Sequence, residues 1–209
     1  MQLPFTLNQF LTVFENYNLA VWPMQVLLNL LALTAIFFVL RKKDYSDKIV
    51  ATILAFLWLW TGIAYHLIYF SSINKGAYFF GILYVIQGML FLFNGVIKSN
   101  FSFKYKSNIY GITGGIFTLY ALIIYPVLGY FLGHVYPKSP TFGLPCPTTI
   151  FTFGILLWTD KRVPKNVLII PFLWSLIGFS AAISLHIRED FGLFLAGVLG
   201  FILILKKNK

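Results

Sequence analysis

Long apolar runs separated by short polar segments are the dominant pattern of this chain. A membrane-spanning helix needs roughly 20 mostly apolar residues. Seven runs approach that length, and they predict helices over residues 20–40, 49–70, 77–97, 109–132, 147–158, 167–186 and 191–205. The fifth and seventh runs are short for full spans, so six spans is the alternative count. The fifth run lengthens if residues 141–146 join it in a partly non-helical form.

The polar segments between these runs are too short to separate two folding units. We therefore predict an all-α fold, a polytopic transmembrane helix bundle forming one domain over residues 1–209. The segment before the first run, residues 1–19, is loosely amphipathic and carries a single charge, Glu15. This pattern predicts a helix that lies along the membrane surface. A disordered leader is the alternative.

Composition supports the same class. Hydrophobic residues make up 59% of the 209 residues and charged residues only 11%, against about 25% charged in typical soluble domains. A soluble domain of this length has too little interior for so much apolar surface. The composition excludes a soluble enzyme, a disordered chain, a disulfide scaffold and a collagen-like fibre, and it makes the lipid bilayer the expected partner.

The net charge of +10 reflects where the basic residues fall. Alternating spans place thirteen of the sixteen on one side: Arg41, Lys42, Lys43, Lys48, Lys98, Lys104, Lys106, Lys161, Arg162, Lys165, Lys206, Lys207 and Lys209. Only Lys75, Lys138 and Arg188 fall on the other side. Lys and Arg are retained on the cytoplasmic side of membranes, so we predict the N-terminus outside and the C-terminus inside. Topology thus explains the charge, and no nucleic-acid partner is expected.

Small residues indicate where helices meet. Gly81, Gly88 and Gly95 share one face of the third run, and Gly111 and Gly115 are four apart in the fourth. Membrane helices associate through close packing of such faces. We expect both faces to contact other helices.

Side chains that could bind a metal or respond to pH lie near the predicted outer end of the bundle: His66, His134, His186 and Cys146. Imidazole and thiolate groups bind metals, and histidine responds to pH. The alternative is that these are structural polar residues at the membrane interface. Neither His-x-x-His nor Cys-x-x-Cys spacing occurs, so the sequence predicts no metal site and no cofactor.

The most distinctive local sequence is the proline-rich segment over residues 140–154. Pro147 can take the first helical position, which would make Cys146 the cap residue, with Thr148, Thr149 and Thr152 following in the first turns. A broken helix at membrane depth lines a cavity or is buried in protein. We predict that this segment forms the wall of a binding pocket or pathway. A purely structural turn with an inert cysteine is the alternative.

Polar residues inside the third run point to the bundle interior, because polar groups are costly in lipid. Gln87 and Asn94 are therefore expected either to line a path or to bond neighbouring helices. The predicted spans contain no Asp, Glu, Lys or Arg, which argues against a retinal protein and against an acidic proton relay. Common catalytic motifs are also missing, so no enzymatic activity is predicted.

Three segments carry a resemblance to a known family. They are Gln2-Leu-Pro-Phe5 with Val21-Trp22-Pro23, Trp60-Thr-Gly-Ile-Ala-Tyr-His66, and Pro-Cys-Pro-Thr-Thr over residues 145–149. The chain resembles an uncharacterised family of small bacterial multi-pass membrane proteins, known only as a domain of unknown function and sometimes labelled permeases. The resemblance implies a bacterial inner-membrane location. It supplies no catalytic residues.

Two functions follow as hypotheses. The first is a small-solute transporter or channel with a site at the outer end, lined by Cys146, Thr148, Thr149 and Thr152, with His66 and His186 near its mouth. A neutral span interior favours a small neutral or weakly charged solute. The second is a membrane sensor or assembly partner that responds to pH, redox state or metal without transport. The sequence is also compatible with a homo-oligomer.

Overall fold

The computed structural model describes residues 4–209, which are 76% helical and form no strand. The α-helices are α1 (Leu7–Ala20), α2 (Met24–Leu40), α3 (Ser46–Trp60), α4 (Gly76–Phe91), α5 (Ile109–Leu119), α6 (Tyr125–Phe131), α7 (Pro145–Leu157), α8 (Lys165–Leu185) and α9 (Phe191–Lys207). Wider π-helical segments extend α3 as η1 (Thr61–Tyr69) and α4 as η3 (Leu92–Ile97), and η4 (Tyr120–Ile124) joins α5 to α6. Short 3₁₀ turns form η2 (Phe70–Ser72) and η5 (Arg188–Asp190).

Four helical stretches are long and apolar enough to cross a membrane: Ser46–Ser72, Gly76–Ile97, Ile109–Phe131 and Lys165–Leu185. The pair α1 and α2 is bent by 85° and makes a fifth candidate if it is counted as one span. Helices α2 and α9 have 17 residues each and α7 has 13, so each alone falls short of a full span. The structure thus supports four or five spans, and these helices fit a multi-pass membrane protein.

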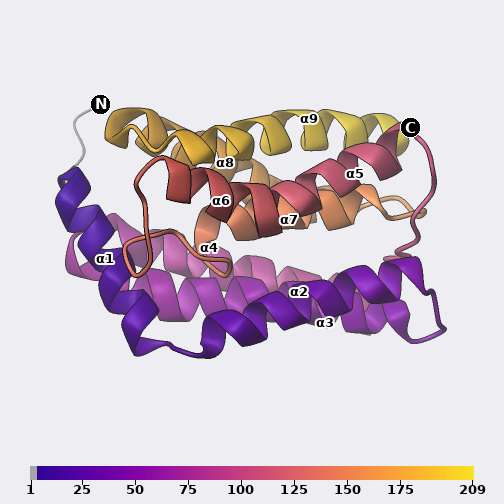
Figure 1. Cartoon of the computed structure of the whole chain (residues 1–209). Helices are drawn as coiled ribbons and strands as arrows, with labels where there is room; N and C mark the ends of the chain where they lie inside the picture. The colour runs from indigo at the N-terminus through magenta and orange to yellow at the C-terminus, as the bar shows by residue number, and fades with distance from the viewer. Residues whose placement is uncertain (1–3) are drawn as a thin grey trace.

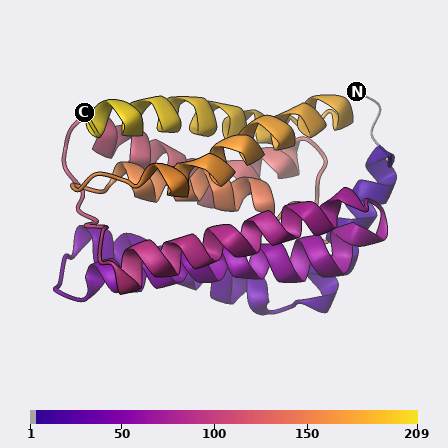
Figure 2. The same ribbon diagram turned by 180° about the vertical axis from the view of Figure 1, so that it is seen from behind.

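The helices form two layers. Helices α2, α3 and α4 make one layer and α5, α6, α8 and α9 the other, with α1 crossing one end of the bundle (Figure 1). The reverse view shows the same separation, with the C-terminus at the end opposite α1 (Figure 2). We call these two ends the α1 end and the basic end.

The basic end collects the loops that carry the thirteen Lys and Arg residues. The backbone N–H of Lys104 donates to the Trp158 carbonyl over 2.7 Å, and the N–H of Asp160 donates to the Ser102 carbonyl over 2.8 Å. The Lys207 ammonium donates to the Leu157 carbonyl over 3.0 Å. These bonds join the segment after η3, the segment after α7 and the last residue of α9, so these three parts of the chain meet at one end of the bundle.

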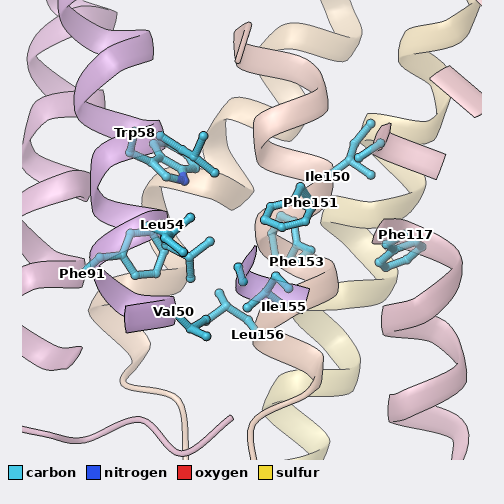
Figure 3. Packing of buried hydrophobic residues seen from close by; sticks show 14 of the residues in the cluster. Val50, Leu54, Trp58, Phe91, Phe117, Ile150, Phe151, Phe153, Ile155 and Leu156 are labelled. Carbon is cyan, nitrogen blue, oxygen red and sulfur yellow. The ribbon is translucent and has the colours of Figure 1, made fainter. Parts of the chain in front are cut away.

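Helix α7 lies at the centre of the bundle. Every residue of α7 except Cys146 is buried, and it contacts α3, α5, α8 and α9. Figure 3 shows Trp58 and Leu54 of α3 and Phe91 of α4 facing Phe151 and Phe153 of α7. Because protein rather than lipid surrounds α7, the length that lipid demands of a helix does not apply to it.

The start of α7 differs from the sequence prediction. Leu144 is the cap and Pro145 takes the first helical position, so the helix begins two residues earlier and Cys146 lies inside its first turn. Successive prolines are tolerated here because the first N–H groups of a helix have no intrahelical acceptor. Gly143, at φ +99°, provides the left-handed turn that leads into the helix.

Glycine contacts hold the helices close together. An added Cβ at Gly81, Gly88 or Gly95 would lie 2.1–2.7 Å from side-chain atoms of the α3–η1 stretch, so the predicted glycine face of α4 is confirmed. On α5 the close approach is made by a different residue. A Cβ at Gly114 would lie 2.7 Å from the Gly154 carbonyl oxygen of α7, whereas one at Gly115 would meet nothing nearer than 3.9 Å.

The α5–α7 contact predicts that alanine substitutions at Gly114 and Gly115 differ in their effect on stability. Gly114→Ala is expected to lower the free energy of unfolding by about 1–3 kcal/mol, because the new methyl group meets backbone that cannot move aside. Gly115→Ala is the matched control, since it gains the same helix propensity without the clash. Reversible unfolding in detergent micelles measures both. Equal stability of the two variants would contradict the contact.

Candidate functional site

A cavity of about 350 Å³ lies at the α1 end, between α1, η1, α4, α6, α7 and α8. Its walls are predominantly apolar, and eight of the lining residues are aromatic: Phe5, Phe10, Phe14, Tyr65, Phe70, Phe80, Tyr125 and Trp174. The rings pack edge-on or stacked; those of Phe80 and Trp174, for example, have centroids 5.4 Å apart at 75°. Ligand pockets in proteins are usually apolar clefts of about 300–1,000 Å³ with a few polar groups, and this cavity lies at the small end of that range.

The lining residues with polar side-chain groups are Asn74, Ser180, Tyr65, Tyr125, Cys146, Trp174 and Asp190, and the last three lie together. Cys146 is adjacent to Asp190. The Trp174 N–H has no acceptor among the described residues, although Trp174 is only 9% exposed. A buried donor without a partner is costly. Within the described residues, the Cys146 side chain lies beside this indole.

Two adjacent acids, Glu189 and Asp190, are buried in η5 at the edge of the cavity. His134 Nδ1 lies 2.5 Å from Glu189 Oε1, which makes an ion pair when the imidazole is protonated. The Tyr125 hydroxyl donates to Asp190 Oδ1 over 2.5 Å, and the Tyr120 hydroxyl donates to the Glu189 carbonyl over 2.8 Å. The short turn before α9 is thus held against the η4–α6 stretch.

The pKa values of Asp190 and His134 are both raised, for different reasons. Burial raises the pKa of Asp190 from 3.8 to about 7, because a charged carboxylate is poorly solvated there. The hydrogen bond with Glu189 raises the pKa of His134 above its ordinary 6.5. The cluster therefore holds protons near neutral pH on groups outside the helical spans.

His66 lies just behind the cavity wall, in the π-helical segment η1. It is fully buried, and neither ring nitrogen has a hydrogen-bond partner among the described residues. Its ring is 5.1 Å from that of Trp174 and 4.7 Å from that of Tyr84, measured between centroids. Segments of π-helix are rare and frequently occur at functional sites.

The candidate threonines of α7 lie deeper than the cavity. The Thr149 hydroxyl is 3.3 Å from the Tyr84 hydroxyl, and Thr152 accepts a 2.9 Å bond from the Trp58 indole. The Thr148 hydroxyl is buried and has no partner among residues 4–209. These three side chains therefore follow inward from the cavity but do not line it.

The remaining candidates are separated from the cavity. Gln87 Nε2 donates to the Val167 carbonyl of the α8 stretch over 3.0 Å, which ties two helices together. Asn94 Nδ2 donates to the Leu90 carbonyl of its own helix over 2.9 Å. His186 ends α8 in a left-handed conformation and is exposed. Of the predicted site residues, only Cys146 lines the cavity.

Asp190, Tyr125 and Trp174 are the site residues that sequence reasoning missed. A signal existed for Asp190, since Glu189 and Asp190 directly precede an apolar run on the side that carries few basic residues. A short acidic loop is ordinarily solvated, however, and burial of this one depends on tertiary packing. No three His, Cys, Asp or Glu side chains within residues 4–209 are grouped as metal ligands would be.

The fold and the cavity define a class: a bundle of long apolar helices, compatible with a multi-pass membrane protein, with a small aromatic pocket at one end. Comparison with known families is more specific. The chain belongs to a family of unknown function, DUF6064, whose match covers residues 7–209. No curated protein and no solved structure matches it.

The His134–Glu189 pair predicts a pH-dependent stability. Since the pKa of His134 is raised in the folded state, its contribution is fully present below about 6.5 and is lost as the pH rises through the folded-state value. We expect His134→Gln to melt below the wild type at acidic pH, with the difference shrinking toward alkaline pH. Thermal unfolding in detergent across pH measures this. A gap that does not change with pH would contradict the ion pair.

Proposed function

We propose that this protein is an integral membrane transporter that binds a small solute in the aromatic cavity at its α1 end. The observation that carries the proposal is the cavity itself, an apolar space of about 350 Å³ with the polar groups of Cys146, Trp174 and Asp190 on its wall. Such a combination is typical of ligand sites. In this proposal the protein lies in a bacterial inner membrane, with the α1 end outside and the basic end inside.

Exposed residues of α8 beside the cavity support the proposed solute binding. Ile177 and Ser180 line the cavity and are also exposed on the outer surface of α8. In this proposal a solute enters the pocket beside these residues of α8. This route favours a solute with apolar character, which partitions into the membrane interface before it enters.

A chain of polar contacts continues inward from the cavity. Trp174 packs against Tyr84 at 5.3 Å between ring centroids, Tyr84 reaches Thr149, and Thr152 bonds Trp58. Polar groups inside a membrane bundle often mark a substrate route. Below them, large buried side chains fill the centre (Figure 3). Transport would therefore require a second arrangement of the helices.

A sensor without transport is the second candidate. It is favoured by the His134–Glu189 pair and by Asp190, whose protonation changes near neutral pH. In that case the protonation state of the cluster, rather than solute movement, would be the output. The absence of solute uptake together with a pH-dependent conformational change would select the sensor.

A bulky side chain placed in the cavity tests the proposed transport function. Ala181 lines the cavity, so Ala181→Phe is expected to reduce uptake of the transported solute into proteoliposomes by at least about tenfold, which corresponds to about 1.4 kcal/mol. Ile183→Phe is the matched control, because Ile183 is exposed on the same helix and does not line the cavity. A solute panel identifies the assay substrate. Full uptake by Ala181→Phe would refute the cavity as the binding site.

The orientation is tested separately by cysteine labelling. On a Cys146→Ala background, Val135→Cys places a thiol in the exposed loop before α7, and Asp44→Cys places one between α2 and α3. In intact cells a membrane-impermeant maleimide should label only the first. Asp44→Cys should react after permeabilisation. The opposite pattern would invert the proposed topology.

A further inference from the structure

The Asp190 carboxyl is buried without an ion-pair partner among the described residues. Among the described residues, the ion pairs are Lys42–Asp47, His134–Glu189 and Lys138–Glu15. Asp190 belongs to none of these pairs, although it is 6% exposed and lies on the cavity wall. A buried carboxylate requires a proton or a cation to offset its charge. The bonded Tyr125 hydroxyl stabilises Asp190 but adds no positive charge.

The rest of the wall suits a cation with an apolar surface. Aromatic rings present a negative face, and cages of such rings bind quaternary ammonium groups. Tyr65 and Phe70 are stacked at 5.6 Å, Phe5 meets Phe70 edge-on at 5.5 Å, and all three residues line the cavity. Lys and Arg are not among the lining residues, so a positive ligand meets no repelling charge on the wall.

We propose that the cavity binds a small organic cation, a quaternary or protonated amine, with its charge near the Asp190 carboxylate and its apolar groups against the aromatic rings. This inference rests on the proposed solute-binding function and names the class of solute. The cavity of about 350 Å³ limits the ligand to a small molecule.

Proton competition follows from the same arrangement. The pKa of Asp190 is about 7 in the ligand-free protein, and a permanent cation binds the ionised form more tightly. Affinity for that cation should therefore rise as the pH rises through about 7. The titratable groups around Asp190 are Tyr65 in η1, Tyr84 on α4, Tyr120 in η4, Tyr125 on α6, His134 in the loop between α6 and α7, Cys146 on α7 and Glu189 in η5. His134 loses its proton in the same direction, so comparison with an Asp190 variant isolates the carboxyl.

The test compares a cation with its neutral carbon isostere. Benzyltrimethylammonium and neopentylbenzene have nearly the same shape and differ in charge. Equilibrium dialysis against the full-length protein in nanodiscs, with binding to empty nanodiscs subtracted, measures both. We expect the cation to bind at least about tenfold more tightly than the isostere, the scale of a desolvated cation–π contact.

Three variants assign that preference. Asp190→Asn keeps an oxygen for the Tyr125 hydroxyl, so it should remain folded while losing most of the cation preference and most of the pH dependence. Phe80→Leu removes a ring but keeps the wall apolar, and it should weaken the cation and not the isostere. Glu15→Gln is the control, because Glu15 is an acid at the same end that does not line the cavity.

The outcomes separate this inference from the proposed function. Equal binding of cation and isostere, unchanged by Asp190→Asn, would overturn the cation assignment and leave a solute-binding cavity in place. A cation preference as large in Asp190→Asn as in the wild type would also overturn it. Failure of both probes to bind would refute the cation, while the Ala181→Phe uptake assay would still decide whether the cavity binds another solute.

Discussion

Burial of α7 is the constraint on which the rest of the bundle depends. A helix of 13 residues cannot present both ends to water across a bilayer of about 30 Å, so the chain leading into it must have its backbone groups bonded by protein. The Thr61 hydroxyl donates to the Gly143 carbonyl over 2.8 Å, and the Asn18 amide donates to the Ser139 carbonyl over 2.8 Å. Helices α1 and α3 thus support the segment that opens onto the cavity.

Those supports also explain why the cavity is at this end. Helix α1 meets α2 at an angle of 85° and contributes Phe10 and Phe14 to the cavity wall. The acids of η5 complete the wall. Burying two acids side by side is unfavourable for folding, and the hydrogen bonds from Tyr125 and His134 offset only part of that cost. Proteins commonly carry such local conflicts at functional sites.

Sequence reasoning predicted the arrangement along the chain better than the site. The apolar runs located the seven longest helical segments beyond α1, and the loops carrying Lys104 and Lys161 meet at one end as the charge pattern indicated. Periodicity could not reveal that α7 is surrounded by protein, because a buried helix and a lipid-facing helix are both apolar. It also could not identify Asp190, since burial of a loop carboxyl is decided by side chains distant in sequence. The start of α7 was misplaced because either Pro145 or Pro147 can occupy the first position of a helix.

The glycine contacts have a mechanical consequence. At Gly62 and Gly81 the backbones of the η1 and α4 segments nearly touch, as those of α5 and α7 do at Gly114 and Gly154, while Gly197 brings α9 against Ser175 of α8. Backbones in direct contact cannot slide past one another without opening a void. The two helices of each pair therefore move together as one rigid unit. At the cavity the seam between α4 and α8 is instead filled by the rings of Phe80 and Trp174, and farther along the same helices are joined by the bond from Gln87 to the Val167 carbonyl, so this pair is held by side chains rather than by backbone contact.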